Sequence, residues 1–169
     1  MAYADGDVAS VLRAADEPAA EDTAALIARV FPSLRAVSVE GEVLEETTYL
    51  PDGLTYAASF QGVDLVCDRR LMFDRPSELQ AHILEAAVGR HVILHAIRSV
   101  SDWLSFTVCE DGRLVRSLSL SQDGGIVENI DDPFPFETPY WAGDRPVEFD
   151  PEWGEEPYAL PFHPLELGN

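Results

Sequence analysis

HVILHAIRSVSDWLSFTVCEDGRLVRSLSLSQDGGIVENI, residues 91–130, is the stretch that decides the fold. Apolar and polar residues alternate along much of it, and short turn-forming groups interrupt it at Ser101-Asp102, Glu110–Gly112 and Asp123–Gly125. Alternation with a period of two is typical of a β-strand with one buried face. The stretch therefore predicts a meander of consecutive antiparallel strands.

The two inner turns fix which residues face each other. Ser101-Asp102 is predicted to be a two-residue turn, which places Ile97 opposite Phe106. A two-residue turn at Asp111-Gly112 would set apolar residues opposite serines. We therefore expect a three-residue loop with Gly112 in the left-handed conformation and Val108 opposite Leu114.

One face of the meander then becomes apolar, with two polar interruptions. The apolar residues are Ile93, Ile97, Leu104, Phe106, Val108, Leu114 and Leu118, and the interruptions in adjacent rows are His95 and Arg116. Buried polar groups need partners. Either Arg116 forms a structural ion pair and His95 binds backbone, or both line a small-molecule pocket together with Asp68. We favour the structural role.

Because a guanidinium cannot escape burial by losing its proton, Arg116 is expected to be buried against a carboxylate. The acids available to it at strand ends and in the C-terminal segment are Asp64, Asp68, Glu128 and Glu137.

The residues before the meander predict helices and further strands. Glu21–Phe31 has helical apolar spacing and ends at Pro32, and Asp7 could cap a helix that begins at Val8. Thr55–Phe60 and Val63–Asp68 read as strands. Asp74–Glu78 resembles a helix entry with Asp74 or Ser77 as the cap. We expect a single α+β domain over residues 1–169, with helices on a mainly antiparallel, possibly mixed, sheet.

Residues 131–169 differ in composition from the core at residues 1–130. Eight of the 12 prolines lie between Pro133 and Pro164, interspersed with Phe, Tyr and Trp. A disordered tail is poor in aromatic residues, so we expect an extended arm that packs on the core. The alternative is a partner-binding surface, for which Tyr140, Trp141 and His163 are candidate residues.

Charge is the strongest compositional signal. The chain has 31 acids and 11 bases, all of them Arg, for a net charge of −20. Binding to a phosphate backbone depends on basic side chains, so direct nucleic-acid binding is not expected. Such a charge suits binding to a basic protein surface, for example as a nucleic-acid mimic. From the charge alone, we favour solubility, base composition or adaptation to salt as its cause, because net charge bears on solubility and association rather than on a site.

The sequence offers no motif for catalysis, a metal or a cofactor. Cys67 and Cys109 lie far apart, without a CxxC or a Cys/His cluster, and are expected to be free thiols. No phosphate-binding glycine loop, GxSxG or HExxH is present. No apolar run approaches the ~20 residues of a membrane span, so we expect a cytoplasmic protein.

Several segments together resemble an uncharacterised family of bacterial proteins. They are GVDLVCDRRL (62–71), DRPSEL (74–79), the hairpin at 102–121, PYWAGDRPV (139–147) and PYALPFHPLELG (157–168). The resemblance covers most of the chain, and its PYWAG and PFHPLELG motifs are long. It implies no activity and no catalytic residues.

Two functions follow as hypotheses. The first is a non-enzymatic acidic interaction module, such as an inhibitor, an immunity-like protein or a regulatory partner of a basic protein. The second is a small-molecule enzyme or ligand-binding protein with a pocket near Asp68, His95 and Arg116. The sequence leaves the oligomeric state open.

Overall fold

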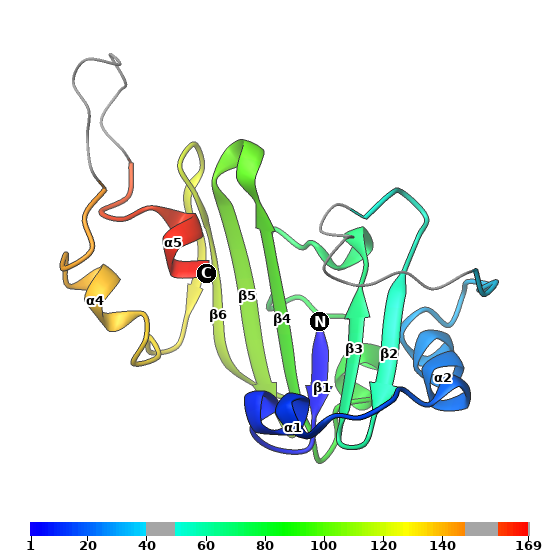
Figure 1. The fold of residues 1–169 in the computed structure, drawn as a ribbon. Helices are drawn as coiled ribbons and strands as arrows, with labels where there is room; N and C mark the ends of the chain where they lie inside the picture. Colours follow the sequence, from blue (N-terminus) through cyan, green and yellow to red (C-terminus); the bar gives the residue numbers. More distant parts are fainter. Residues whose placement is uncertain (40–49, 148–158, 169) are drawn as a thin grey trace.

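A computed structural model describes residues 1–39, 50–147 and 159–168, which Figure 1 shows in colour. Seven strands in this part of the chain form one sheet in the order β2-β3-β1-β4-β5-β6-β7. They are β1 (Ala2–Ala4), β2 (Tyr56–Phe60), β3 (Val63–Cys67), β4 (His91–Arg98), β5 (Trp103–Glu110), β6 (Arg113–Ser121) and β7 (Gly125–Ile130). Each neighbouring pair is antiparallel, which confirms the α+β prediction and settles the sheet as antiparallel rather than mixed.

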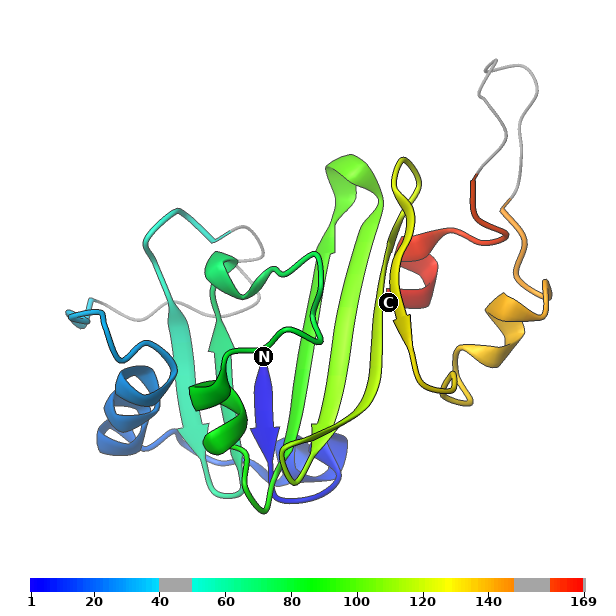
Figure 2. The ribbon, with the colours of Figure 1, turned by 180° about the vertical axis from the view of Figure 1, so that it is seen from behind.

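Five α-helices accompany the sheet in the same ranges. They are α1 (Val8–Ala14), α2 (Ala20–Val30), α3 (Ala81–Glu85), α4 (Thr138–Trp141) and α5 (Pro164–Gly168). As predicted, Asp7 caps α1 by accepting a hydrogen bond of 2.8 Å from the N–H of Ser10. Figures 1 and 2 show α2 and α3 on one face of the sheet and α1 and α5 on the other.

We call these two sides the helical face and the arm face, and each has its own apolar core. The core of the helical face consists of Tyr3, Leu26, Val30, Val66, Leu71, Leu79, Ile83, Ala87, Val92, Leu94 and Cys109. The core of the arm face consists of Leu104, Phe106, Leu118, Leu120, Leu160, Phe162 and Leu167. The sheet is therefore a middle layer, and alternate residues of β4–β6 serve different cores.

The turn between β4 and β5 is longer than predicted. Residues Ser99–Ser101 form a short 3-10 turn (η3), and Asp102 follows in the left-handed region with a φ of 42°. The pairing consequently shifts by two residues from the predicted one, and Ile97 faces Leu104. A shift of two keeps every side chain on its predicted face, so the error in register left the face assignment of both strands correct.

At the turn between β5 and β6, the predicted loop and pairing are wrong. Gly112 has the expected positive φ, 73°. Asp111 also has a positive φ, 50°, and these two residues form the whole turn. A β-bulge then interrupts the ladder, so that Cys109 faces Leu114 whereas Val108 faces Arg116. The bulge supplies the extra residue that we had assigned to the loop. Leu114 therefore packs on the helical face.

Helix α3 begins later than its sequence signature predicts. The N–H and hydroxyl groups of Ser77 donate to the Glu128 carboxylate on β7, at 3.0 and 2.6 Å, instead of capping a helix. The hydroxyl of Ser105 on β5 also binds the carbonyl of Phe73 at 3.0 Å. These long-range bonds hold residues 72–80 across the sheet, and α3 starts only at Ala81.

The described parts of the arm, residues 131–147 and 159–168, pack on the arm face as expected. The rings of Trp141 and Phe162 meet edge to face with centroids 4.9 Å apart. Leu160, Phe162 and Leu167 belong to the buried core, and Phe134, Tyr140 and Trp141 pack against it. Residues 148–158 of the predicted arm lie outside the described residues.

Candidate functional site

The most deeply buried charged group is an ion pair between Arg116 on β6 and Glu137 at the start of α4. Both side chains have an exposure of 0%. Nε and Nη2 of Arg116 donate to the two Glu137 oxygens at 2.9 and 2.7 Å, which is the bidentate geometry of strong charge-assisted pairs. The prediction that Arg116 is buried against one of four acids is confirmed, with Glu137 as the partner.

The third guanidinium nitrogen of Arg116, Nη1, is also occupied. It donates to Oδ1 of Asn129 at 2.7 Å and lies within 3.2 Å of three backbone carbonyls, those of Ser117, Ile130 and Asp131. Every guanidinium nitrogen therefore has an acceptor from the chain itself. Arg116 therefore links β6, the end of β7 and the arm, and its side chain is closed to solvent.

Glu137 is held in its ionised form by its neighbours. Burial acts to raise its pKa, but hydrogen bonds from Arg116, the Phe134 N–H and the Trp141 indole outweigh it. The pKa of Glu137 consequently lies below its ordinary value. The carboxylate is thus a fixed anion and a poor candidate for a general acid.

A second charged cluster lies on the helical face around Asp64 of β3. Its Oδ2 accepts from Arg29 of α2 at 3.0 Å and from Arg90 at 2.6 Å, and its Oδ1 accepts from the Ser59 hydroxyl. Arg90 also reaches Asp5 at 2.6 Å. Burial acts to raise the pKa of Asp64, but these bonds outweigh it and the pKa is lowered.

Tyr3 of β1 lies beside this cluster. The Arg29 guanidinium lies 5.6 Å from the centre of its ring, a cation–π contact. The Tyr3 hydroxyl is buried, has no hydrogen-bond partner within the described residues, and has its pKa raised by burial to about 12. It is therefore neutral across the physiological range.

Asp68 follows the same alternation as Asp64 and turns to the helical face. It accepts hydrogen bonds from the Thr55 hydroxyl and from the side chain and N–H of Arg70. Arg116 and His95 lie on the arm face, as the pairs Val108–Arg116 and His95–Phe106 show. The structure thus keeps His95 and Arg116 on one face but does not bring Asp68 to them.

The two histidines named from the sequence lie where the end of the arm meets the β4–β5 hairpin. His95 as a residue is exposed, but its Nε2 lies against Gly168 of α5. Partial desolvation lowers the pKa of His95, and a hydrogen bond to the Gly168 backbone acts in the opposite direction. Nε2 of His163 lies 3.6 Å from Asp102.

Tyr140 and Trp141 are half-buried, and both work within the arm. The Tyr140 hydroxyl donates to the carbonyl of Glu166 at 2.8 Å, and the Trp141 indole donates to Glu137. Their rings also contact Phe162. These contacts support the packing interpretation of the arm.

A polar layer that we did not single out as a site lies under residues 72–80. Glu128 accepts from the hydroxyls of Ser77 and Ser117, whereas the buried Ser119 hydroxyl and the Trp103 indole N–H have no hydrogen-bond partner within the described residues. The alternating SLSLS of residues 117–121 is the signal that places serines on this face. Its polar groups are mostly satisfied locally, so it is a structural layer.

Comparison with known proteins gives the chain a family. A family of unknown function, DUF6928, matches residues 1–169. The chain belongs to this family. No curated protein and no solved structure matches the chain. The resemblance to an uncharacterised family is therefore confirmed, and DUF6928 membership assigns no activity to any residue.

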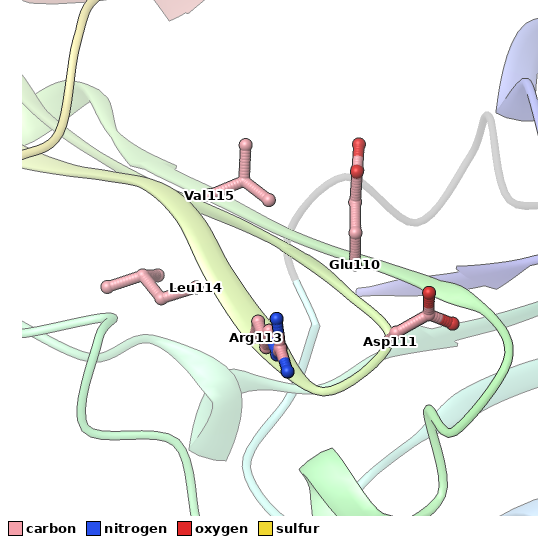
Figure 3. A pocket seen from close by; sticks show the side chains of 5 residues that line it. All are labelled: Glu110, Asp111, Arg113, Leu114 and Val115. Atoms are coloured by element: carbon pink, nitrogen blue, oxygen red, sulfur yellow. The ribbon is translucent and has the colours of Figure 1, made fainter.

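An open hollow of about 580 Å³ lies at the turn between β5 and β6. Figure 3 shows its five lining residues, Glu110, Asp111, Arg113, Leu114 and Val115, all from one hairpin. Ligand pockets usually enclose most of a small molecule between several elements. This hollow therefore offers a surface rather than an enclosed binding site.

The described residues contain no group of three or more His, Cys, Asp or Glu side chains that could hold a metal ion. No helix among them has the length and apolar character needed to cross a membrane.

Proposed function

We propose that this DUF6928 protein is a non-enzymatic binding module whose partner is a basic protein. The pairing of its arginines carries the proposal. Within residues 1–39, 50–147 and 159–168, five arginines form ion pairs with five acids, and the whole chain, with 31 acids and 11 arginines, keeps a net charge of −20. The paired arginines are Arg29, Arg69, Arg70, Arg90 and Arg116, and their acids are Asp5, Asp52, Asp64, Asp68 and Glu137.

The surface field of such a chain is strongly negative. It attracts a basic protein and raises the rate of encounter, and it repels the phosphates of nucleic acids. The charged sites support binding more than chemistry, because the buried charges are engaged with one another. An enzyme built on Asp68, His95 and Arg116 has less support, since Arg116 is internal and Asp68 lies on the other face.

The same proposal places the protein in the cytoplasm, as one domain. Cys67 and Cys109 are free thiols, which is typical of a reducing compartment.

The proposal is tested by affinity capture from a lysate of the protein's own cells at low salt, followed by elution with salt. We expect one stoichiometric basic partner, which then binds again when both proteins are purified. Acid-to-amide changes at Asp131 and Asp132 should weaken this complex. The same changes at Asp16 and Glu17, which are also exposed and remove the same charge, provide the matched control.

Capture of no partner, or of one that is acidic or indifferent to salt, would remove the proposal. A thermal shift with one member of a metabolite panel, in the absence of any protein partner, would support a small-molecule function instead.

A further inference from the structure

The two edges of the sheet differ in how they are closed. At β2, the N–H of Ser59 donates to the Thr23 hydroxyl of α2 at 3.0 Å, and the Ser59 carbonyl accepts from Ala19 at 2.8 Å. The residues at the start of α2 thus satisfy both the N–H and the C=O group of Ser59 with hydrogen bonds. An additional strand could not bind there without displacing the helix.

The edge at β7 has no such cover within the described residues. Among the described residues, its backbone hydrogen bonds run to β6, and the one further backbone hydrogen bond is that of the Ile130 carbonyl with Arg116. Figure 2 shows β7, in yellow, beyond β6 on the side away from β2. An edge strand directs alternate N–H and C=O groups outward, where another strand can bind them.

The side chains of β7 protect this edge weakly. Proteins guard such edges with Lys, Pro, bulges or charged side chains. Gly125–Ile130 contains no Lys, Arg or Pro, and its one carboxylate, Glu128, is buried. A bulge next to Val127 is the one protective feature in these six residues.

The side chains on and beside β7 indicate which kind of segment this edge can bind. Ile126 and Ile130 are 48% and 36% exposed and lie on opposite faces of the strand. Asp123 stands at one end of the strand, and Asp131 and Asp132 at the other, all exposed. Residues 117–144 contain no Arg. The edge therefore combines apolar side chains in its middle with acids at both ends.

We propose that β7 binds an extended basic segment of the partner as an eighth strand. This rests on the proposed function and names its contact. Main-chain bonds supply affinity in this mode, and alternate side chains supply specificity. The span from residue 123 to residue 131 corresponds to about 27 Å of strand. The segment would carry Arg or Lys at each end, opposite the acids, and apolar residues between them.

A second copy of the chain is a poorer occupant. It would bring the same acids to the same edge, and like charges would face each other across the contact.

The test uses a peptide of about eight residues with Arg at both ends and alternating Val and Thr between them. Hydrogen exchange is followed in the full chain with and without the peptide. The amides of β7 should gain protection, and those of β2 should not change. A peptide with Glu in place of Arg should not bind.

Variants then locate the contact. Ile126→Lys puts a charge of the partner's sign on the edge and should weaken peptide binding roughly ten-fold or more. Val100→Lys adds the same charge at an exposed residue of the β4–β5 turn and should leave binding within roughly two-fold. Unfolding curves of both variants check that each remains folded.

Unchanged exchange of β7 with the peptide, or equal effects of the two variants, would overturn the edge proposal. So would a dimer in solution that Ile126→Lys dissociates, because a second copy would then occupy β7. A basic cellular partner that binds Ile126→Lys and Val100→Lys equally well would leave the proposed function standing without this contact. If no basic partner binds the protein, both the proposed function and the proposed contact at β7 are wrong.

Discussion

The two faces of the sheet handle buried charge in different ways. On the arm face, Arg116 and Glu137 form a fully buried ion pair, in which each side chain is 0% exposed. On the helical face, Asp64 is 8% exposed, but its partners Arg29 and Arg90 are 41% and 19% exposed and reach solvent. Water can replace a lost partner around Asp64, whereas it cannot enter around Arg116 without opening the arm.

Burial therefore separates the charged groups that the fold depends on from those that tolerate substitution. An ion pair near solvent contributes little, because water screens the charges and the long side chains lose freedom. A sealed pair contributes little more than apolar residues of the same shape would, but removing one partner leaves a charge without compensation. We therefore expect the loss of stability on substitution to increase with the burial of the charged group.

The largest effect is expected from Glu137→Gln. It leaves the Arg116 guanidinium buried without its counter-charge, at a cost of about 3–5 kcal/mol in the free energy of unfolding. Arg116→Met should cost less, because the remaining Glu137 can take up a proton and become neutral. Urea unfolding of the two variants measures the difference. Equal and negligible effects would show that water reaches Arg116.

A smaller loss is expected from Asp64→Asn. The change removes a carboxylate that accepts from two arginines and a serine, and hydrogen bonds to charged groups contribute about 1.5–3 kcal/mol each. Because Arg29 and Arg90 can turn to water, we expect only about 1–2 kcal/mol in total. A loss as large as that of Glu137→Gln would erase the distinction between the faces.

Acid should act on both faces in the same direction. The lowered pKa of Glu137 means that its stabilising effect is fully present above its ordinary value of 4.5 and is lost as the pH falls through the lowered value. The lowered pKa values of Asp64 and Asp68 act likewise below 3.8. The contribution of these three carboxylates to the free energy of unfolding should therefore be constant above about pH 5 and decrease below it. A maximum of stability below about pH 4 would contradict these signs.

The smallest effect is expected from Asp52→Asn. Asp52 pairs with Arg69 at 2.8 Å, and both side chains are exposed. Surface pairs of this kind contribute about 0–1 kcal/mol, so the variant should be close to the parent in urea. A large loss would mean that this pair has a structural role that its exposure does not suggest.

Much of the fold was accessible from alternation alone. The predicted face of each residue in β4 and β5 is correct although the predicted register is wrong. The register error is two residues, and a shift of two leaves each side chain on the same face of the sheet. The β5–β6 turn defeated the same reasoning. We rejected a two-residue turn on the assumption of an unbroken ladder, and a bulge beside Val115 broke it.

The charged clusters were accessible only in part. Burial of Arg116 followed from its place among apolar neighbours, but the choice of Glu137 among four acids depended on how the arm crosses the sheet. Ser77 shows the same limit, since its local pattern predicted a cap and the distant Glu128 took its donors instead. Long-range partners of polar groups are set by tertiary packing, which one sequence does not display.

The most direct test of the functional account is the affinity of the purified partner complex as a function of salt. If the net charge of −20 attracts a basic partner, the dissociation constant should rise roughly ten-fold or more from low to high salt, mainly through slower association. The Asp131→Asn/Asp132→Asn variant should show a shallower dependence than the Asp16→Asn/Glu17→Gln control. An affinity that does not change with salt would contradict the account.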